Sequence, residues 1–145
     1  MHYKPPKPLL QLKSVPRFSQ VYWCDFSISN VLPEFDDVHP AIIIRSGQKL
    51  ENPHIVVPVT TRDHEGDVYA HRLDINPNPK RQGDVSWVVR NHLCTVASER
   101  LKPMTDRYGN EKFPVIGAAD MHQIGKLIRR ALERIISASI ELPKP

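Results

Sequence analysis

This sequence of 145 residues contains few cysteines, no pair of histidines at helical spacing and none of the common glycine-rich loop motifs. It has two cysteines, Cys24 and Cys94, too few for a disulfide framework or a four-thiolate zinc site. Its seven histidines never stand at the i, i+4 spacing of a helical metal-binding pair. There is no Walker loop, no GxGxxG and no GxSxG, which excludes the commonest nucleotide-binding and serine-hydrolase motifs. We therefore expect no metal and no cofactor.

Long hydrophobic runs are absent as well. The longest aliphatic run covers residues 41–44 and is far too short to cross a bilayer. Residues 1–7 are polar and proline-rich, unlike the apolar centre of a signal peptide. With 40% hydrophobic and 25% charged residues, the composition is that of an ordinary soluble domain. These features predict a cytoplasmic protein with reduced cysteines and no membrane partner.

Proline, by contrast, is abundant, and it marks the N-terminal segment. Four of the 14 prolines lie in residues 1–18, together with lysine and arginine and without any acidic residue. Such a segment cannot hold a helix, so we expect an extended basic arm over 1–18 and a single domain over 19–145. The arm is either a solvated tail or a contact to phosphates or a partner. The net charge of +4 permits an anionic partner but does not require one.

Segments rich in β-branched and aromatic residues follow, separated by turn formers. They predict five strands over residues 20–26, 41–45, 54–61, 68–75 and 84–96. Pro58 interrupts the third, which suggests an edge or a bulge there. Residues 76–83 are predicted to form a loop, because Pro, Asn and Gly interrupt them throughout.

The C-terminal segment has the pattern of one amphipathic helix over 120–140. Asp120 and Gln123 have the spacing of a capping box, and apolar residues then recur at helical spacing. Strands followed by a single helix, without βαβ alternation, predict a mainly β fold built as a small antiparallel barrel.

Acid–base and cationic groups gather at the ends of the predicted strands. His39 precedes the second strand, Thr60, Thr61 and Arg62 end the third, and His92 lies near the end of the fifth. Metal-free phosphodiester cleavage needs a proton acceptor, a proton donor and groups that stabilise charge on the phosphate. Histidine can serve as acid or base near neutral pH. Each of these residues also fits a structural role, and His92 could equally bind RNA or cap its own strand.

The order of several motifs resembles the MazF/PemK toxin family. The resemblance covers about residues 19–102, with the terminal helix placed as in that family. The motifs that carry it are VYWCDF at 21–26, Glu34 ahead of HPAIII at 39–44, VVPVTT at 56–61, and LCTV at 93–96 followed by Arg100-Leu101.

The resemblance implies a small SH3-like antiparallel β-barrel with a C-terminal α-helix, usually a homodimer. It implies a metal-independent endoribonuclease that cuts single-stranded RNA to a 2′,3′-cyclic phosphate and a 5′-hydroxyl, and that a cognate antitoxin inhibits. Thr60 falls on the catalytic threonine of the family and Glu34 on the glutamate of its first long loop.

One departure from the family concerns its catalytic arginine. Where the family has Arg-Pro, this chain has His39-Pro40, and an imidazole cannot make the two-pronged contact of a guanidinium with phosphate. Three interpretations stay open: His39 replaces the arginine in acid–base chemistry, Arg45 or Arg62 reaches the phosphate instead, or cleavage is lost.

We expect His39 and Thr60 to be catalytic. The residues expected to contact substrate are Glu34, Thr61, Arg62, His92, Arg45, Lys80 and Arg81. The expected partners are single-stranded RNA, an antitoxin and a second copy of the chain. Two alternatives are a gyrase-poisoning toxin on the same barrel and a non-catalytic barrel that only binds nucleic acid or a peptide.

Overall fold

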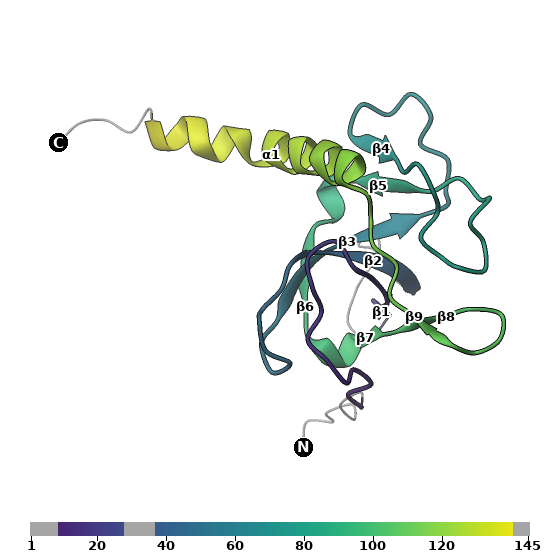
Figure 1. Ribbon diagram of the computed structural model, residues 1–145. Helices are drawn as coiled ribbons and strands as arrows, with labels where there is room; N and C mark the ends of the chain where they lie inside the picture. Colours follow the sequence, from purple (N-terminus) through teal and green to yellow (C-terminus); the bar gives the residue numbers. More distant parts are fainter. Residues whose placement is uncertain (1–8, 28–36, 141–145) are drawn as a thin grey trace, which may run out of the picture.

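Antiparallel strands dominate the computed structural model, which describes residues 9–27 and 37–140 (Figure 1). The strands are β1 Val21–Asp25, β2 Val38–Arg45, β3 His54–Thr60, β4 Ala70–Arg72, β5 Trp87–Val89, β6 Cys94–Val96, β7 Leu101–Lys102, β8 Met104–Thr105 and β9 Glu111–Lys112. Two 3₁₀ turns, η1 Arg90–His92 and η2 Ser98–Arg100, and one helix, α1 Ala118–Ile140, complete the described part of the chain. The prediction of a mainly β fold with a C-terminal helix is confirmed.

The two longest strands, β2 and β3, form the centre of the sheet. Its strand order is β4-β5-β3-β2-β1-β7, and β6 pairs with β3 off this path. Every pairing is antiparallel, and β8 with β9 forms a separate hairpin. Within the described residues, the hydrogen-bonded path stays open between β4 and β7.

The sequence predicted one continuous fifth strand, and this is wrong. The structure has two short strands there, β5 and β6, with η1 between them. On one edge of β3, residues 54–56 pair with β6 and residues 59–60 pair with β5. The chain therefore leaves one pairing site on this edge of β3 after β5 and enters the other at β6, and η1 connects the two strands. Pro58 falls at this change inside β3, where it faces Ala41. The expected edge at Pro58 is confirmed locally, since Pro58 lies between the residues of β3 that pair with β6 and those that pair with β5. The register shift lies elsewhere, between Ile43 and Arg45.

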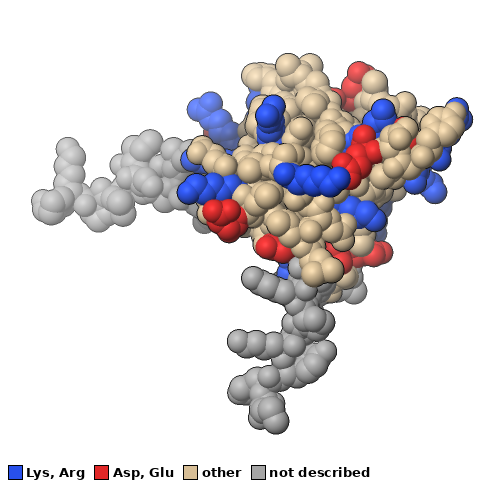
Figure 2. Space-filling model, turned by 60° about the horizontal axis from the view of Figure 1, so that its bottom comes forward, with Lys and Arg blue, Asp and Glu red and all other residues tan. Residues whose placement is uncertain are grey.

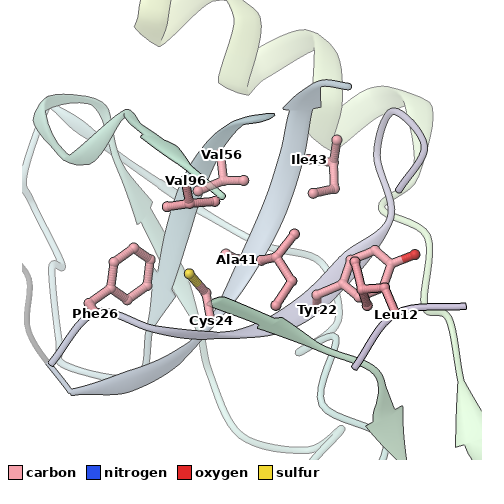
Figure 3. Close-up of a cluster of buried hydrophobic side chains, with 9 residues drawn as sticks. Leu12, Tyr22, Cys24, Phe26, Ala41, Ile43, Val56 and Val96 are labelled. Carbon is pink, nitrogen blue, oxygen red and sulfur yellow. The ribbon is translucent and has the colours of Figure 1, made fainter. Parts of the chain in front are cut away.

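Alternation along the central strands divides the core into two clusters, one on each face of the sheet. We call the first the inner cluster (Figure 3); it consists of Leu12, Tyr22, Cys24, Phe26, Ala41, Ile43, Val56, Val96 and Leu101. The second, the helix-side cluster, consists of Val21, Ile42, Val57, Val59, Leu73, Val88, Met104, Ile116 and Ile124. Leu12 belongs to the predicted arm yet is buried in the inner cluster. The domain limits at residues 18 and 19 stay a prediction.

Helix α1 packs its first half against the sheet and projects past it with its second half (Figure 1). It begins at Ala118 rather than Asp120, so the predicted capping box is wrong. The Asp120 carboxylate instead accepts bonds from His71 Nε2–H at 2.7 Å and from the Asp74 backbone N–H at 3.1 Å. The Asp120 carboxylate therefore bonds to β4 and to the chain after it, and does not cap its own helix.

His54 joins two turns at the far end of β3. Its ring is fully buried; Nδ1 accepts the Gly47 N–H at 2.9 Å, and Nε2 lies 2.8 Å from Ser98 Oγ. Because Nδ1 is an acceptor, the proton of the neutral ring is on Nε2 and is donated to Ser98. Burial lowers the pKa of His54, as expected when a charged ring would lose its hydration.

The His54 contact predicts that acid destabilises the fold. The unfolded ring titrates near pH 6.5 and the folded ring below that value, so the unfolded state binds more protons in between. The stabilisation is complete above pH 6.5 and is lost as the pH falls through the folded pKa. We expect the melting temperature to drop below about pH 6.5, and to drop less in His54→Gln. Equal drops in both proteins would assign the effect to another group.

Close packing at Gly47 gives a second prediction for the same turn. A Cβ at this position would lie 2.4 Å from the Pro53 carbonyl oxygen and 2.8 Å from Asn52 Cβ. We expect Gly47→Ala to lower the free energy of unfolding by about 1–3 kcal/mol, measured by urea denaturation. Gly83 is the matched control, since a Cβ there meets nothing within 4 Å and Gly83→Ala should stay within about 0.5 kcal/mol. Equal stability of the two variants would contradict the packing argument.

Candidate functional site

Strand register places His39 and Thr60 on one face of the sheet. His39 is directly opposite Cys24 of β1, whose side chain belongs to the inner cluster. In β3, Val56 belongs to the same cluster, and alternation puts Thr60 on its face. The β2–β3 register, in which Ala41 faces Pro58, continues to His39 opposite Thr60. The two residues predicted to be catalytic thus lie at the same end of the inner cluster.

The Thr60 hydroxyl is held by the turn that follows it. Its Oγ1 accepts the Arg62 backbone N–H at 3.1 Å, and the residue is 9% exposed. Trp87 of β5 is its neighbour across the sheet. Because the oxygen accepts from Arg62, the hydroxyl hydrogen can be donated to a bound oxygen, such as one of a phosphate.

The 3₁₀ turn η1 brings His92 to this region. Its first residue, Arg90, stacks on the Tyr69 ring with its guanidinium carbon 3.8 Å from the ring centroid, and donates its backbone N–H to the Tyr69 carbonyl at 3.0 Å. His92 is half-buried, and its Nδ1 is buried. Burial lowers the pKa of His92, and nearby His64 and His39 lower it further. His39 and His64, from two other segments of the chain, therefore both lie within electrostatic reach of His92.

His64 is the member of this group that sequence reasoning missed. Its Nδ1 lies 3.1 Å from the Asp67 carboxylate, and its ring centroid lies 6.3 Å from that of Trp87. The Tyr69 backbone N–H, and then His64, hold the pKa of Asp67 below its usual range. The HEGD sequence at 64–67 reads as a polar turn, and no spacing signal links it to His39 or His92. Across residues 9–27 and 37–140, no three His, Cys, Asp or Glu side chains are grouped as a metal site.

A pocket of about 230 Å³ opens beside this end of the strands. Its lining consists of Trp23, Val38, His39, Pro40, Val59, Thr61, Asn76, Asn78, Arg81 and Asp84. It brings together three residues expected from the sequence, His39, Thr61 and Arg81. Thr60 and Thr61 lie on opposite faces of the sheet, because side chains alternate along a strand. Thr61 shares the face of Val59. An aromatic wall with amide, carboxylate and guanidinium groups suits the edge and face of a nucleobase.

The loop that closes the pocket is organised by its own asparagines. Asn76 is buried and its Oδ1 accepts the Asn78 N–H at 3.2 Å, while Asn78 Oδ1 accepts the Lys80 N–H at 3.1 Å. Arg81 lies 3.6 Å from the Asp84 carboxylate. The sequence predicted this loop but not the asparagines as lining residues, because the local pattern does not say where the loop lies against the strands.

Four other residues expected to contact substrate are not found to line this pocket. Arg45 is at the opposite end of β2 from His39, on the order of 20 Å away along the strand. The side chains of Arg62 and Lys80 are exposed and do not line the pocket. Glu34 lies outside the described residues. Roles for these four residues stay predictions.

Both thiols at this end of the inner cluster are held in the protonated form. Burial, and then the nearby Cys94, raises the pKa of Cys24 to about 12, and burial raises the pKa of Cys94. Thiolate is the nucleophilic form of cysteine, so neither group suits covalent catalysis.

The surface seen in Figure 2 carries basic side chains spread among acidic ones, over the part of the chain that is described. This face therefore offers no continuous basic field to a polyanion.

Comparison with known proteins decides the family. Residues 17–132 match the family described as PemK-like, MazF-like toxin of type II toxin-antitoxin system. The chain belongs to this PemK/MazF family. Its match spans β1 through most of α1, and so includes His39, Thr60, η1 and the pocket.

Solved structures support the same fold. The crystal structure of MazF (Form-I) from Deinococcus radiodurans superposes with a TM-score of 0.63 at 17% sequence identity, covering 83% of this chain and 99% of that one. The predicted small barrel with a C-terminal helix is thereby confirmed as the PemK/MazF fold. No curated protein sequence matches this chain. In the described residues, no helix has the length and apolar character needed to cross a membrane.

Proposed function

We propose that this PemK/MazF chain is the toxin of a type II toxin–antitoxin system and acts as a metal-independent, sequence-specific endoribonuclease on single-stranded RNA such as mRNA. The observation that carries the proposal is the shared strand face of His39 and Thr60. A proton-transfer group and a hydroxyl donor at one strand end are the parts that phosphodiester cleavage requires. The enzyme would act in the cytoplasm, where reduced Cys24 and Cys94 fit their unpaired state.

In this mechanism the 2′-hydroxyl of the RNA is the nucleophile. His39 moves a proton to or from the reacting oxygens, and Thr60 donates its hydroxyl hydrogen to a phosphate oxygen. Arg81 and Thr61, in the adjoining pocket, hold the neighbouring nucleotide. Substitution of histidine for the family's arginine removes a fixed positive fork but adds a group that can exchange protons near neutral pH.

Two partners are proposed from membership of the family. The first is an antitoxin protein that binds the toxin and blocks its activity. The second is another copy of the chain, since toxins of this family are usually homodimers. Exposed apolar side chains at Ile75, Phe113 and Val115 line a groove of about 610 Å³, and such a surface suits protein contact.

The direct test is RNA cleavage by the purified chain with and without a chelator. We expect cleavage in both, with products ending in a 2′,3′-cyclic phosphate and a 5′-hydroxyl. His39→Ala should lower the rate about 100-fold or more, the usual contribution of an acid–base group. The control is His122→Ala, which alters an exposed histidine on α1. Cleavage that vanishes with chelator, or full activity of His39→Ala, would contradict the mechanism.

RNA binding can be tested separately at Arg81. Removing one phosphate contact should weaken binding for all sequences and flatten the dependence of log affinity on log salt by about 0.7 for single-stranded RNA. We expect this for Arg81→Gln in fluorescence anisotropy titrations between low and high salt. Arg107→Gln is the control, since Arg107 lies beyond β8 and stacks on Tyr108. An unchanged slope in Arg81→Gln would remove the residue from the binding surface.

A second function, a barrel that binds RNA without cutting it, is favoured by one observation. The family's arginine is absent at His39, and Arg45 lies at the other end of β2, so no described guanidinium replaces it through this strand. Tight binding without cleavage of varied RNAs would support this function in place of the nuclease.

A further inference from the structure

Two histidines, rather than one, border the strand ends of the proposed cleavage site. His39 lies on β2 and His92 in η1, which contacts β3. In β6, Cys94 pairs with Val56, and His92 precedes Cys94 by two residues. Because β6 runs antiparallel to β3, stepping back from Cys94 moves toward the end of β3 that carries Thr60. His92 therefore approaches Thr60 from the edge of β3 opposite to His39.

The two imidazoles influence each other's protonation. The proximity of His39, together with burial and His64, lowers the pKa of His92, because two positive rings side by side repel. Two titratable groups act on His92: His39 on β2 and His64 in the β3–β4 loop, which is itself paired with Asp67. Strand β3 and helix α1 also pack against η1. The repulsion disfavours the state in which both rings carry a proton, and the lowered pKa favours the neutral form of His92.

We propose that His92 is the second proton-transfer residue of the site, accepting the proton of the RNA 2′-hydroxyl while His39 donates a proton to the departing 5′-oxygen. This inference rests on the nuclease function proposed above. From the sequence alone, His92 could contact RNA or cap its strand. The present inference gives His92 a catalytic role instead.

The step balances with these groups alone. The neutral His92 ring takes the 2′-O–H proton through Nε2, since its Nδ1 is buried, and the 2′-oxygen forms a bond to phosphorus. The bond from phosphorus to the 5′-oxygen breaks, and the His39 ring gives that oxygen its proton. The products are a 2′,3′-cyclic phosphate and a 5′-hydroxyl, and proton exchange with water returns both rings to their starting states.

RNA with sulfur in place of the bridging 5′-oxygen separates the two roles. Thiolate leaves without protonation, so this substrate needs a base but no acid. We expect His39→Gln to lose about 100-fold or more on ordinary RNA and to regain most of that loss on the sulfur substrate. His92→Gln should lose about 100-fold or more on both substrates. His122→Gln, on the exposed face of α1, should match the wild type on both.

The wild-type protein gives a second readout that needs no folded variant. On ordinary RNA the rate should rise and then fall with pH, since a neutral base and a protonated acid are both required. On the sulfur substrate the fall at high pH should disappear. Persistence of the fall at high pH would show that no acid protonates the 5′-oxygen and would overturn the assignment.

The outcomes distinguish this inference from the function on which it rests. Cleavage by the wild type with full activity in His92→Gln overturns the role of His92 and leaves the nuclease intact. Rescue of His92→Gln by the sulfur substrate also overturns it, because it would make His92 the acid. A wild-type protein that cuts neither substrate overturns the nuclease and this inference together.

Discussion

The pairing of β2 with β3 is the constraint on which the rest of the structure depends. These strands contribute to both core clusters, and their register sets which side chains share a face. A slip of one residue would exchange the two faces, because side chains alternate along a strand. It would move His39 and Thr60 away from each other's face and place core residues in water. The burial that stabilises the sheet is therefore also what positions the candidate site.

Environment gives the histidines of this chain different roles. His54 is fully buried, with both ring nitrogens bonded, so it acts as a neutral link between two turns. His71 ties β4 to the first turn of α1 through Asp120. His39 and His92 are half-buried near strand ends, where substrate can approach, and the lowered pKa of His92 has chemical use there. Residue type alone does not separate these cases, whereas burial and partners do.

In the proposed function, His39 stands where the PemK/MazF family is expected to carry an arginine, and the two side chains support different kinds of catalysis. Arginine stays charged and holds phosphate, but it does not exchange protons at neutral pH. Histidine does exchange protons, and in the proposed mechanism a second imidazole at His92 supplies the complementary step. That mechanism assigns the arginine's electrostatic contribution to Thr60 and to Arg81 in the adjoining pocket. On this view the substitution moves the site from charge stabilisation toward acid–base chemistry.

Sequence by itself determined the local features of this protein. Runs of β-branched residues predicted β1, β2 and β3, helical spacing predicted α1, and the motif order predicted the family and paired His39 with Thr60. Each of these depends on neighbours in the chain, so the pattern of side chains is enough to specify it. Tertiary structure decided what depends on distant partners: the break at η1, the capture of Asp120 by His71, the place of Asn76 in the pocket and the approach of His64 and His92. Sheet pairing and side-chain contacts between remote segments produce those features, and periodicity along one segment carries no information about them.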